Sequence, residues 1–332
     1  MTKVFLLTLV PLIAATHQLR GQMTADDRQV SVAPYWGGRQ ASLSLTFDDG
    51  LQDQFTLAAP ELKKRGLRAT FAIVGSKVGG IMRSSQDRKM GIDGTPCMTW
   101  DMLRQLVADG HEIGSHGWGH KNVTKLSDEA LRHEVLCNDS ALHAQTGQWP
   151  RSYFYPGNQK DSATVAFCEQ GRVGSRLFQT SIGGKRDTLW LRRWVDGLLE
   201  RGEWGVGMTH GIATGYDHFA DPQVLWHLLD YVASLEGHLW VAPFAEVLAY
   251  IKERQNTRMD VCNQGRKAVV TLTTNLPADV FNYPLTLLLS SRPVAKVEQD
   301  HRSLAVYGQA GRQMVDVRLH AGPVTIYYEQ IR

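Results

Sequence analysis

Two adjacent carboxylates, Asp48 and Asp49, are the side chains of this sequence best placed to do chemistry, because they follow an alternating stretch directly. Leu43, Leu45 and Phe47 would share one face of a strand, so Asp48 would point to the other face. Asp49 would then leave the strand on the side opposite to Asp48. We therefore expect the two carboxylates to have different functions.

A pair of histidines four residues apart, His116 and His120, follows a second predicted strand, His111–Ser115. Two imidazoles at this spacing can bind one metal ion if the backbone turns once between them. Gly117 and Gly119 each disfavour a regular helix by roughly 1 kcal/mol relative to alanine, so we expect a tight loop. On their own, the two histidines are equally compatible with ordinary surface or core positions.

Adding Asp49 to His116 and His120 gives two imidazoles and one carboxylate, a common ligand set for a catalytic divalent metal. Zinc is the expected ion, and cobalt, nickel and manganese also accept these ligands. Asp48, next to this site, is suited to act as the general base for an attacking water. The sequence thus predicts a metal-dependent hydrolytic site.

Two further side chains fit such a site. Arg151 adjoins the predicted strand Ser152–Tyr155, and we expect it to orient Asp48 and to stabilise its ionised form. The alternative is an exposed surface arginine. His210 follows the predicted strand Trp204–Thr209, where a protonated imidazole could donate a proton to the leaving group.

The alternation of strand and helix patterns from about residue 40 to 250 predicts a parallel α/β sheet or barrel. Strands are expected over Ala41–Phe47, Arg68–Val74, His111–Ser115, Ser152–Tyr155 and Trp204–Thr209. One helix should begin at Ser127 and end at Gly147, and another should begin at Asp221–Pro222 and end before Gly237. After Arg254, alternating segments without helices predict a small antiparallel β domain.

The N-terminus has the pattern of a secretory signal peptide, since Lys3 precedes an apolar run, Val4–Ala15, that is too short to span a bilayer. An uncleaved anchor and a buried N-terminal strand are the alternatives. We expect a secreted, periplasmic or cell-envelope protein without further membrane spans. The domains would then be a signal peptide (1–22), a catalytic domain (23–255) and a small β-sandwich-like domain (256–332).

The composition argues against a nucleic-acid partner, and it does not decide whether the cysteines form disulfides. The net charge is +3 over 332 residues, and the lysines and arginines are scattered, so we expect no nucleic-acid partner. The four cysteines lack the paired spacing of a zinc knuckle. They can form one or two disulfides after export or remain buried thiols.

Four segments in order, TFDDG, SHGWGH, RSYFYPG and GMTHG, resemble the motifs of the polysaccharide deacetylases, the NodB-homology carbohydrate esterases of family four. The stretches RATFAIVG and ADGHEIGSH are also similar to that family. The resemblance covers roughly residues 40 to 252. It implies a distorted parallel (β/α) barrel with fewer than eight strands and metal-dependent removal of acetyl groups.

Position by position, the resemblance implies Asp48 as the base, His210 as the acid and Arg151 as the residue that tethers the base. It also implies Asp49, His116 and His120 as the metal ligands. The family's aromatic motif is loosely matched at Arg193–Asp196, which makes Trp194 a candidate substrate-lining residue, with a core tryptophan as the alternative. Pro156 and Gly157 are further candidates for substrate and oxyanion contacts, because Gly157 replaces the family's usual aromatic and leaves its backbone N–H available.

The implied substrate is an acetylated polysaccharide or oligosaccharide, most often with the acetyl on an amino-sugar nitrogen. Three alternatives remain open: an O-acetyl carbohydrate esterase such as one acting on acetylxylan, an esterase or amidase with a non-sugar substrate, and a carbohydrate-binding protein without turnover. The presence of both Asp48 and His210 disfavours the last of these. The sequence does not specify the glycan or the oligomeric state.

Overall fold

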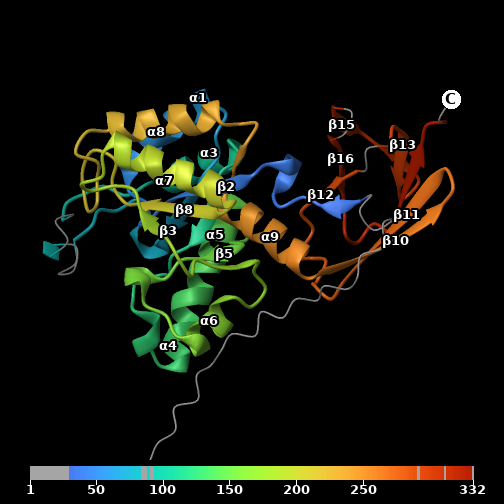
Figure 1. The fold of residues 1–332 in the computed structure, drawn as a ribbon. Helices are drawn as coiled ribbons and strands as arrows, with labels where there is room; N and C mark the ends of the chain where they lie inside the picture. Colours follow the sequence, from blue (N-terminus) through green and yellow to red (C-terminus); the bar gives the residue numbers. More distant parts are fainter. Residues whose placement is uncertain (1–29, 84–87, 90–92, 290–291, 310–311, 331–332) are drawn as a thin grey trace, which may run out of the picture.

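The computed structural model describes residues 30–83, 88–89, 93–289, 292–309 and 312–330, and the predicted signal peptide lies outside them. An α/β part and a β part can be distinguished (Figure 1). Among the described helices, none has the length and apolar character needed to cross a membrane. The four cysteines, Cys97, Cys137, Cys168 and Cys262, all lie in the described part of the chain and are not joined in disulfides.

A parallel sheet forms the centre of the α/β part, with the strand order β6-β5-β4-β3-β2-β8-β7, and β9 pairs with β2 as well. Every strand pair in it is parallel. The predicted distorted parallel barrel is thereby confirmed, with seven strands following one another along its wall and β9 lying off this path against β2. The strands are β2 (Ala41–Phe47), β3 (Thr70–Ile73), β4 (Glu112–Ser115), β5 (Ser152–Tyr153), β6 (Gly174–Ser175), β7 (Thr180–Ser181), β8 (Trp204–Thr209) and β9 (Leu239–Val241).

The alternation along β2 separates an apolar face from a polar one, as predicted. Leu43, Leu45 and Phe47 are fully buried in the main core, which also includes Leu225 and Leu229 of the surrounding helices. The helices are α1 (Ala59–Lys64), α3 (Trp100–Ala108), α4 (Asp128–Arg132), α5 (Asn138–Thr146), α6 (Ser162–Cys168), α7 (Thr188–Arg201), α8 (Gln223–Ser234) and α9 (Phe244–Gln255).

The predicted helix starts and stops near residues 127, 147 and 221 are also confirmed. The Ser127 side chain accepts a hydrogen bond from the backbone of Ala130 at the start of α4. Gly147 ends α5 in a left-handed conformation, with φ 75°. Asp221 accepts from the backbone N–H of Gln223 at the start of α8. A π-helical stretch, His133–Cys137, joins α4 to α5.

Two antiparallel sheets make up the β part. One contains β10 (Thr257–Gln264), β11 (Lys267–Thr274), β17 (Val324–Tyr328), β13 (Val294–Gln299) and β14 (Arg302–Leu304). The other contains β1 (Ser31–Val32), β12 (Leu285–Leu288), β16 (Arg312–Val317) and β15 (Val306–Gln309). The predicted antiparallel β domain is present, but β1 joins it from the N-terminal side of the barrel.

The two parts share a core. Trp240 of β9 and Val247 and Tyr250 of α9 belong to the same buried cluster as Leu285 and Val315 of the β part. The Tyr250 hydroxyl donates to the Ala33 carbonyl at 2.9 Å. Helix α9 therefore packs between the barrel and the antiparallel sheets, as Figure 1 shows.

Candidate active site

The carboxyl ends of the parallel strands surround a cavity of about 270 Å³. Six of the predicted site residues lie around it, namely Asp48, Asp49, His116, His120, Gly157 and His210. Its other lining residues are Tyr155, Asn158, Arg176, Gln179, Met208 and Tyr216. The fold thus brings together side chains that are up to 168 positions apart in the sequence, Asp48 and Tyr216.

The two adjacent carboxylates line the same cavity, so the prediction that they diverge to opposite sides is wrong. Asp49 has φ 74°, in the left-handed region, whereas strand alternation assumes an extended backbone. The turn brings the Asp49 side chain back toward the cavity that Asp48 faces. Such a conformation is uncommon for a residue other than glycine and is often found at functional sites.

Asp49, His116 and His120 form a cluster with ligand geometry for a metal ion. Oδ1 of Asp49 lies 3.4 Å from Nε2 of His116 and 3.3 Å from Nε2 of His120. The candidate ligand atoms all lie within 4.8 Å of one another. Three protein ligands of this kind leave coordination positions for water and substrate.

The chemistry of these donors fits a divalent cation. Oδ1 of Asp49 is buried and has no hydrogen-bond partner in the described part of the chain. Burial raises the pKa of Asp49, but the neighbouring imidazoles hold it well below its usual value, so the carboxyl is ionised. Burial lowers the pKa of His120 to about 4, which keeps that imidazole neutral and able to bind a metal.

A hydrogen bond on the side of the ring away from Asp49 fixes the orientation of the His116 imidazole. Its Nδ1 lies 2.8 Å from the carbonyl oxygen of Phe154, so the N–H on Nδ1 donates to that carbonyl. Nε2 then faces Asp49. Burial lowers the pKa of His116, but the hydrogen bond to Asp49 and the charge of Asp48 raise it above its ordinary value, so a metal at Nε2 would displace a proton. An imidazole held through its second nitrogen in this way is the usual arrangement for a metal ligand.

The loop that carries His120 is held by the buried carboxylate of Glu134. Its Oε1 accepts from the backbone N–H of Gly119 at 2.9 Å and of Lys121 at 3.0 Å. Gly117 has φ 78°, and a Cβ there would lie 2.6 Å from the same Oε1. Glycine at position 117 therefore allows Glu134 to reach the loop and set the position of His120, which the sequence had only suggested as a tight turn.

Asp48 is paired with Arg176, a residue that the sequence analysis did not select. The guanidinium donates to both carboxylate oxygens, at 2.8 and 2.5 Å, and to the Thr46 hydroxyl at 2.8 Å. Both side chains are almost completely buried. Burial raises the pKa of Asp48, but the charges of Arg176 and His116 outweigh it and keep the pKa below its ordinary value.

Arg151, predicted to orient Asp48, lies at the other end of the barrel, and that prediction is wrong. The residue precedes β5, so it lies at the amino end of this parallel strand, whereas Asp48 follows the carboxyl end of β2. Its Nη2 donates to the Val280 carbonyl at 2.9 Å. Arg176 comes directly after the two-residue strand β6 and thus reaches the correct end.

The carboxyl ends of β2 and β8 are tied together by Gln54. Its Nε2 donates to the carbonyl oxygens of Asp48 at 2.6 Å and His210 at 2.8 Å. The adjacent Asp53 carboxylate accepts backbone N–H groups of the loop after His210, beginning with Ile212 at 2.8 Å. His210 itself packs against the ring of Tyr216, with a centroid distance of 4.9 Å.

The three predicted substrate contacts have different surroundings. Gly157 lines the cavity and has φ 59°, which suits glycine. Pro156, the residue before it, is buried and is not among the described residues that line the cavity. Trp194 packs into the main core next to Trp190, at a centroid distance of 6.5 Å, so its prediction as a substrate-lining residue is wrong and the core alternative holds.

Residues 37–171 match the family model for polysaccharide deacetylases. A peptidoglycan-N-acetylglucosamine deacetylase, PgdA, of Listeria monocytogenes is 28% identical over 109 residues, which cover 32% of this chain and 20% of the relative. A chitin deacetylase of Pestalotiopsis sp is 27% identical over 141 residues, 42% of each chain. The predicted resemblance to the polysaccharide deacetylases is confirmed.

The polysaccharide deacetylase match contains Asp48, Asp49, His116 and His120, and it ends before Arg176 and His210. This chain spans less than half the length of the two curated deacetylases above. Among solved structures, the peptidoglycan deacetylase PdaC of Bacillus subtilis is 18% identical, with a TM-score of 0.43, and the alignment covers 65% of this chain and 93% of that one.

Proposed function

We propose that this protein is a metal-dependent hydrolase that removes acetyl groups from a glycan of the cell wall or the extracellular space, with the N-acetyl group of an amino sugar as its preferred target. The observation that carries this proposal is the Asp49, His116 and His120 cluster beside the Asp48–Arg176 pair in one cavity. The polysaccharide deacetylase match and the names of its relatives support the substrate class.

Asp49, His116 and His120 would hold one divalent metal, with zinc as the first candidate. When bound, it would polarise the acetyl carbonyl and lower the pKa of the attacking water. Asp48 then accepts the proton of that water. Its low pKa keeps it ionised, and Arg176 holds both carboxylate oxygens so that the side chain cannot rotate away.

His210 lines the same cavity as the metal-ligand cluster and is suited to donate a proton to the departing amine. Gln54 fixes the backbone of both Asp48 and His210, so it keeps the proposed base and acid at a constant separation. The Gly157 backbone N–H is the candidate donor to the developing oxyanion. The products are acetate and a free amino sugar.

Acetate release from a panel of acetylated glycans tests this proposal directly. The panel includes chitin oligosaccharides, peptidoglycan fragments and acetylated xylan, each with chelator and then with zinc, cobalt, nickel or manganese restored. We expect release from the N-acetylated glycans that chelator abolishes and metal restores. Release from acetylated xylan alone would point to the esterase alternative, and no release from any glycan would overturn the proposal.

A further inference from the structure

A second cavity, of about 410 Å³, opens at the amino ends of the barrel strands. It lies where β2, β3 and β9 begin, whereas the candidate active site lies at their carboxyl ends. The seven-residue strand β2 separates the two ends by about 20 Å, given a rise of about 3.3 Å per residue. This second cavity, which we call the Arg39 cavity, is therefore a separate site.

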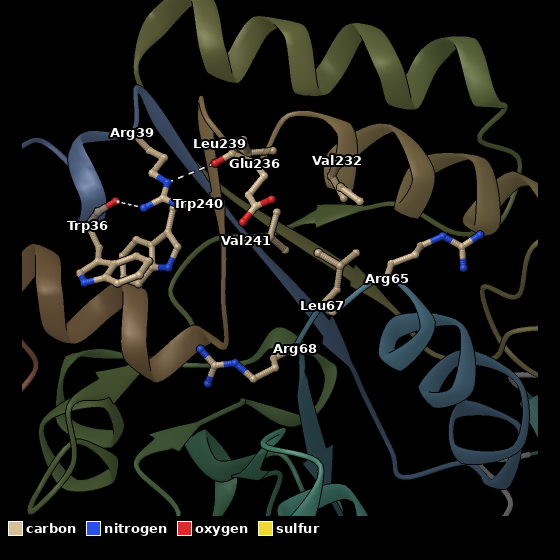
Figure 2. Close-up of a pocket in the computed structure, with 12 residues that line it drawn as sticks. Trp36, Arg39, Arg65, Leu67, Arg68, Val232, Glu236, Leu239, Trp240 and Val241 are labelled. Carbon is tan, nitrogen blue, oxygen red and sulfur yellow. Dashed lines mark hydrogen bonds between the residues drawn. The ribbon is translucent and has the colours of Figure 1, made fainter. Parts of the chain in front are cut away.

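Both charged and apolar side chains line the Arg39 cavity. Figure 2 shows Arg39 and Glu236 toward the top of the view, Leu67 below them, and Arg65 and Arg68 beside and below Leu67. The volume falls in the range of about 300–1,000 Å³ that is typical of small-molecule sites. Apolar surface combined with a few polar groups is also typical of such sites.

Arg39 is held in place by the turn Trp36–Gly37–Gly38–Arg39. Its Nε donates to the Glu236 carbonyl at 3.1 Å, and its guanidinium lies 4.9 Å from the Trp36 ring centroid. Gly37 has φ 65°, and a Cβ on it would lie 1.6 Å from Nη1 of Arg39. The turn therefore requires glycine at this position in order to fold Arg39 back over Trp36.

The charges in the cavity select among ligand classes. Arg65 is paired with Glu61 and Asp230, and Arg68 is paired with Glu246. Within the described part of the chain, the hydrogen bonds of Arg39 go to neutral backbone carbonyls, so its charge and that of the exposed Glu236 are available to a ligand. A polyanion would be repelled by Glu236, and a purely apolar ligand would desolvate both charged groups at a cost.

A polyhydroxylated ring meets all these conditions. Its hydroxyl groups can accept from the Arg39 guanidinium and donate to the Glu236 carboxylate, while its C–H face covers Leu67 and Val241. We propose that the Arg39 cavity binds a saccharide unit of a glycan chain, at a distance from the site of hydrolysis. The identity of this glycan as the substrate polymer rests on the proposed function, but the presence of a saccharide site does not.

Titration of the protein with the soluble tetramers of N-acetylglucosamine and of glucosamine, followed by calorimetry, tests the proposal. The titrated protein carries Asp49→Ala and is kept with chelator, so that the cavity at the carboxyl ends of the strands holds no metal and cannot hydrolyse the saccharide. Arg39→Ala and Glu236→Ala should each weaken binding about tenfold, as expected for loss of a charge-assisted hydrogen bond. Arg104→Ala is the control for removal of an arginine elsewhere on the surface, because Arg104 is exposed, donates to the Gln145 carbonyl and pairs with Asp101, away from this cavity.

Thermal melting shows whether each variant folds. When Arg39→Ala or Glu236→Ala is made in the protein that retains Asp49, its rate of acetate release from a short substrate should equal that of the unsubstituted protein. Wild-type affinity in both Arg39→Ala and Glu236→Ala would overturn the proposal. So would the absence of saccharide binding before either substitution is made. Binding without acetate release from any glycan would instead contradict the proposed function and leave the saccharide site supported.

Discussion

At the carboxyl end of the barrel, charged side chains are buried in direct contact with one another, whereas at the amino end Arg39 and Glu236 remain accessible around an open cavity. Asp48 and Arg176 each keep less than 5% of their side-chain surface exposed. Buried charges carry a desolvation penalty of several kcal/mol per ion, and pairing them only partly offsets it. A buried ion pair suits a site where a charge must be held in one position, as in catalysis, so we assign catalysis to the carboxyl end of the barrel. Accessible charges around an open cavity suit reversible binding, which we assign to the amino end.

The largest expected effect is the loss of acetate release when either of the two neighbouring carboxylates, Asp48 or Asp49, is replaced, and metal content distinguishes the two losses. Asp49→Ala should abolish metal binding and with it acetate release, because it removes one of three ligands. Asp48→Asn should leave the metal bound and lower kcat by about 10²–10⁴-fold, the usual contribution of a general base. Metal content and acetate release are measured on the same samples. Full activity of Asp48→Asn with metal bound would show that Asp48 is not the base.

A second experiment contrasts two arginines at opposite ends of the barrel. Arg176→Lys should lower kcat by about 10–100-fold, the usual cost of losing a supporting contact, because lysine cannot hold both oxygens of Asp48. Arg151→Lys should leave kcat unchanged, since Arg151 contacts the Val280 carbonyl far from the cavity. Steady-state kinetics with melting curves for both variants checks this. A larger loss of kcat in the Arg151 variant would reverse our assignment.

A smaller effect, on metal affinity, is expected when the glycines between His116 and His120 are replaced by alanine. Gly117→Ala should weaken metal affinity about tenfold, because its Cβ would displace Glu134 and with it the His120 loop. Gly119→Ala is the control, since its Cβ would come no closer than 3.4 Å to Glu134 and needs no unusual φ. Competition with a chelating dye measures the metal affinity of each. Equal affinities for the two variants would show that Glu134 does not position His120.

The smallest expected effect is on the pH dependence of stability, and it comes from Glu253 of α9. The carboxylate of this buried residue accepts a hydrogen bond from the backbone N–H of Tyr283. Burial raises the pKa of Glu253 to about 7, above the ordinary value of 4.5. The folded state therefore holds this proton more tightly than the unfolded state, and the stability gained below pH 4.5 is lost as the pH rises through 7. Melting temperatures of the protein and Glu253→Gln, measured from pH 5 to 8, should converge at low pH. Parallel curves would contradict the raised pKa.

Much of the candidate site could be predicted from the sequence, because its residues lie directly after strands with strong alternation. Asp48 follows β2 and His210 follows β8, and both strands have the predicted bounds. Arg176 follows β6, whose two residues, Gly174 and Ser175, have no apolar periodicity to reveal a strand. A strand so short is specified by its neighbours in the sheet and not by its own sequence.

The error over Arg151 has a related cause. The strand after it was recognised, but the residue comes before that strand, and in a parallel sheet the two ends of a strand face opposite sides of the domain. The divergence expected for Asp48 and Asp49 failed because a single left-handed residue cancels the alternation. Side-chain periodicity predicts position within regular strands, and it does not extend to the turn that follows them.

The pairing of β1 with β12 has a consequence for how the chain can be cut and in what order it can fold. Ser31 pairs with Leu288, so the sheet that contains β12 joins two segments that are made at very different times during synthesis. A fragment beginning at residue 256 would lack β1 and would expose the edge of β12. A contact between residues so far apart in the sequence carries a large loop-closure cost, so we expect this pairing to form late in folding.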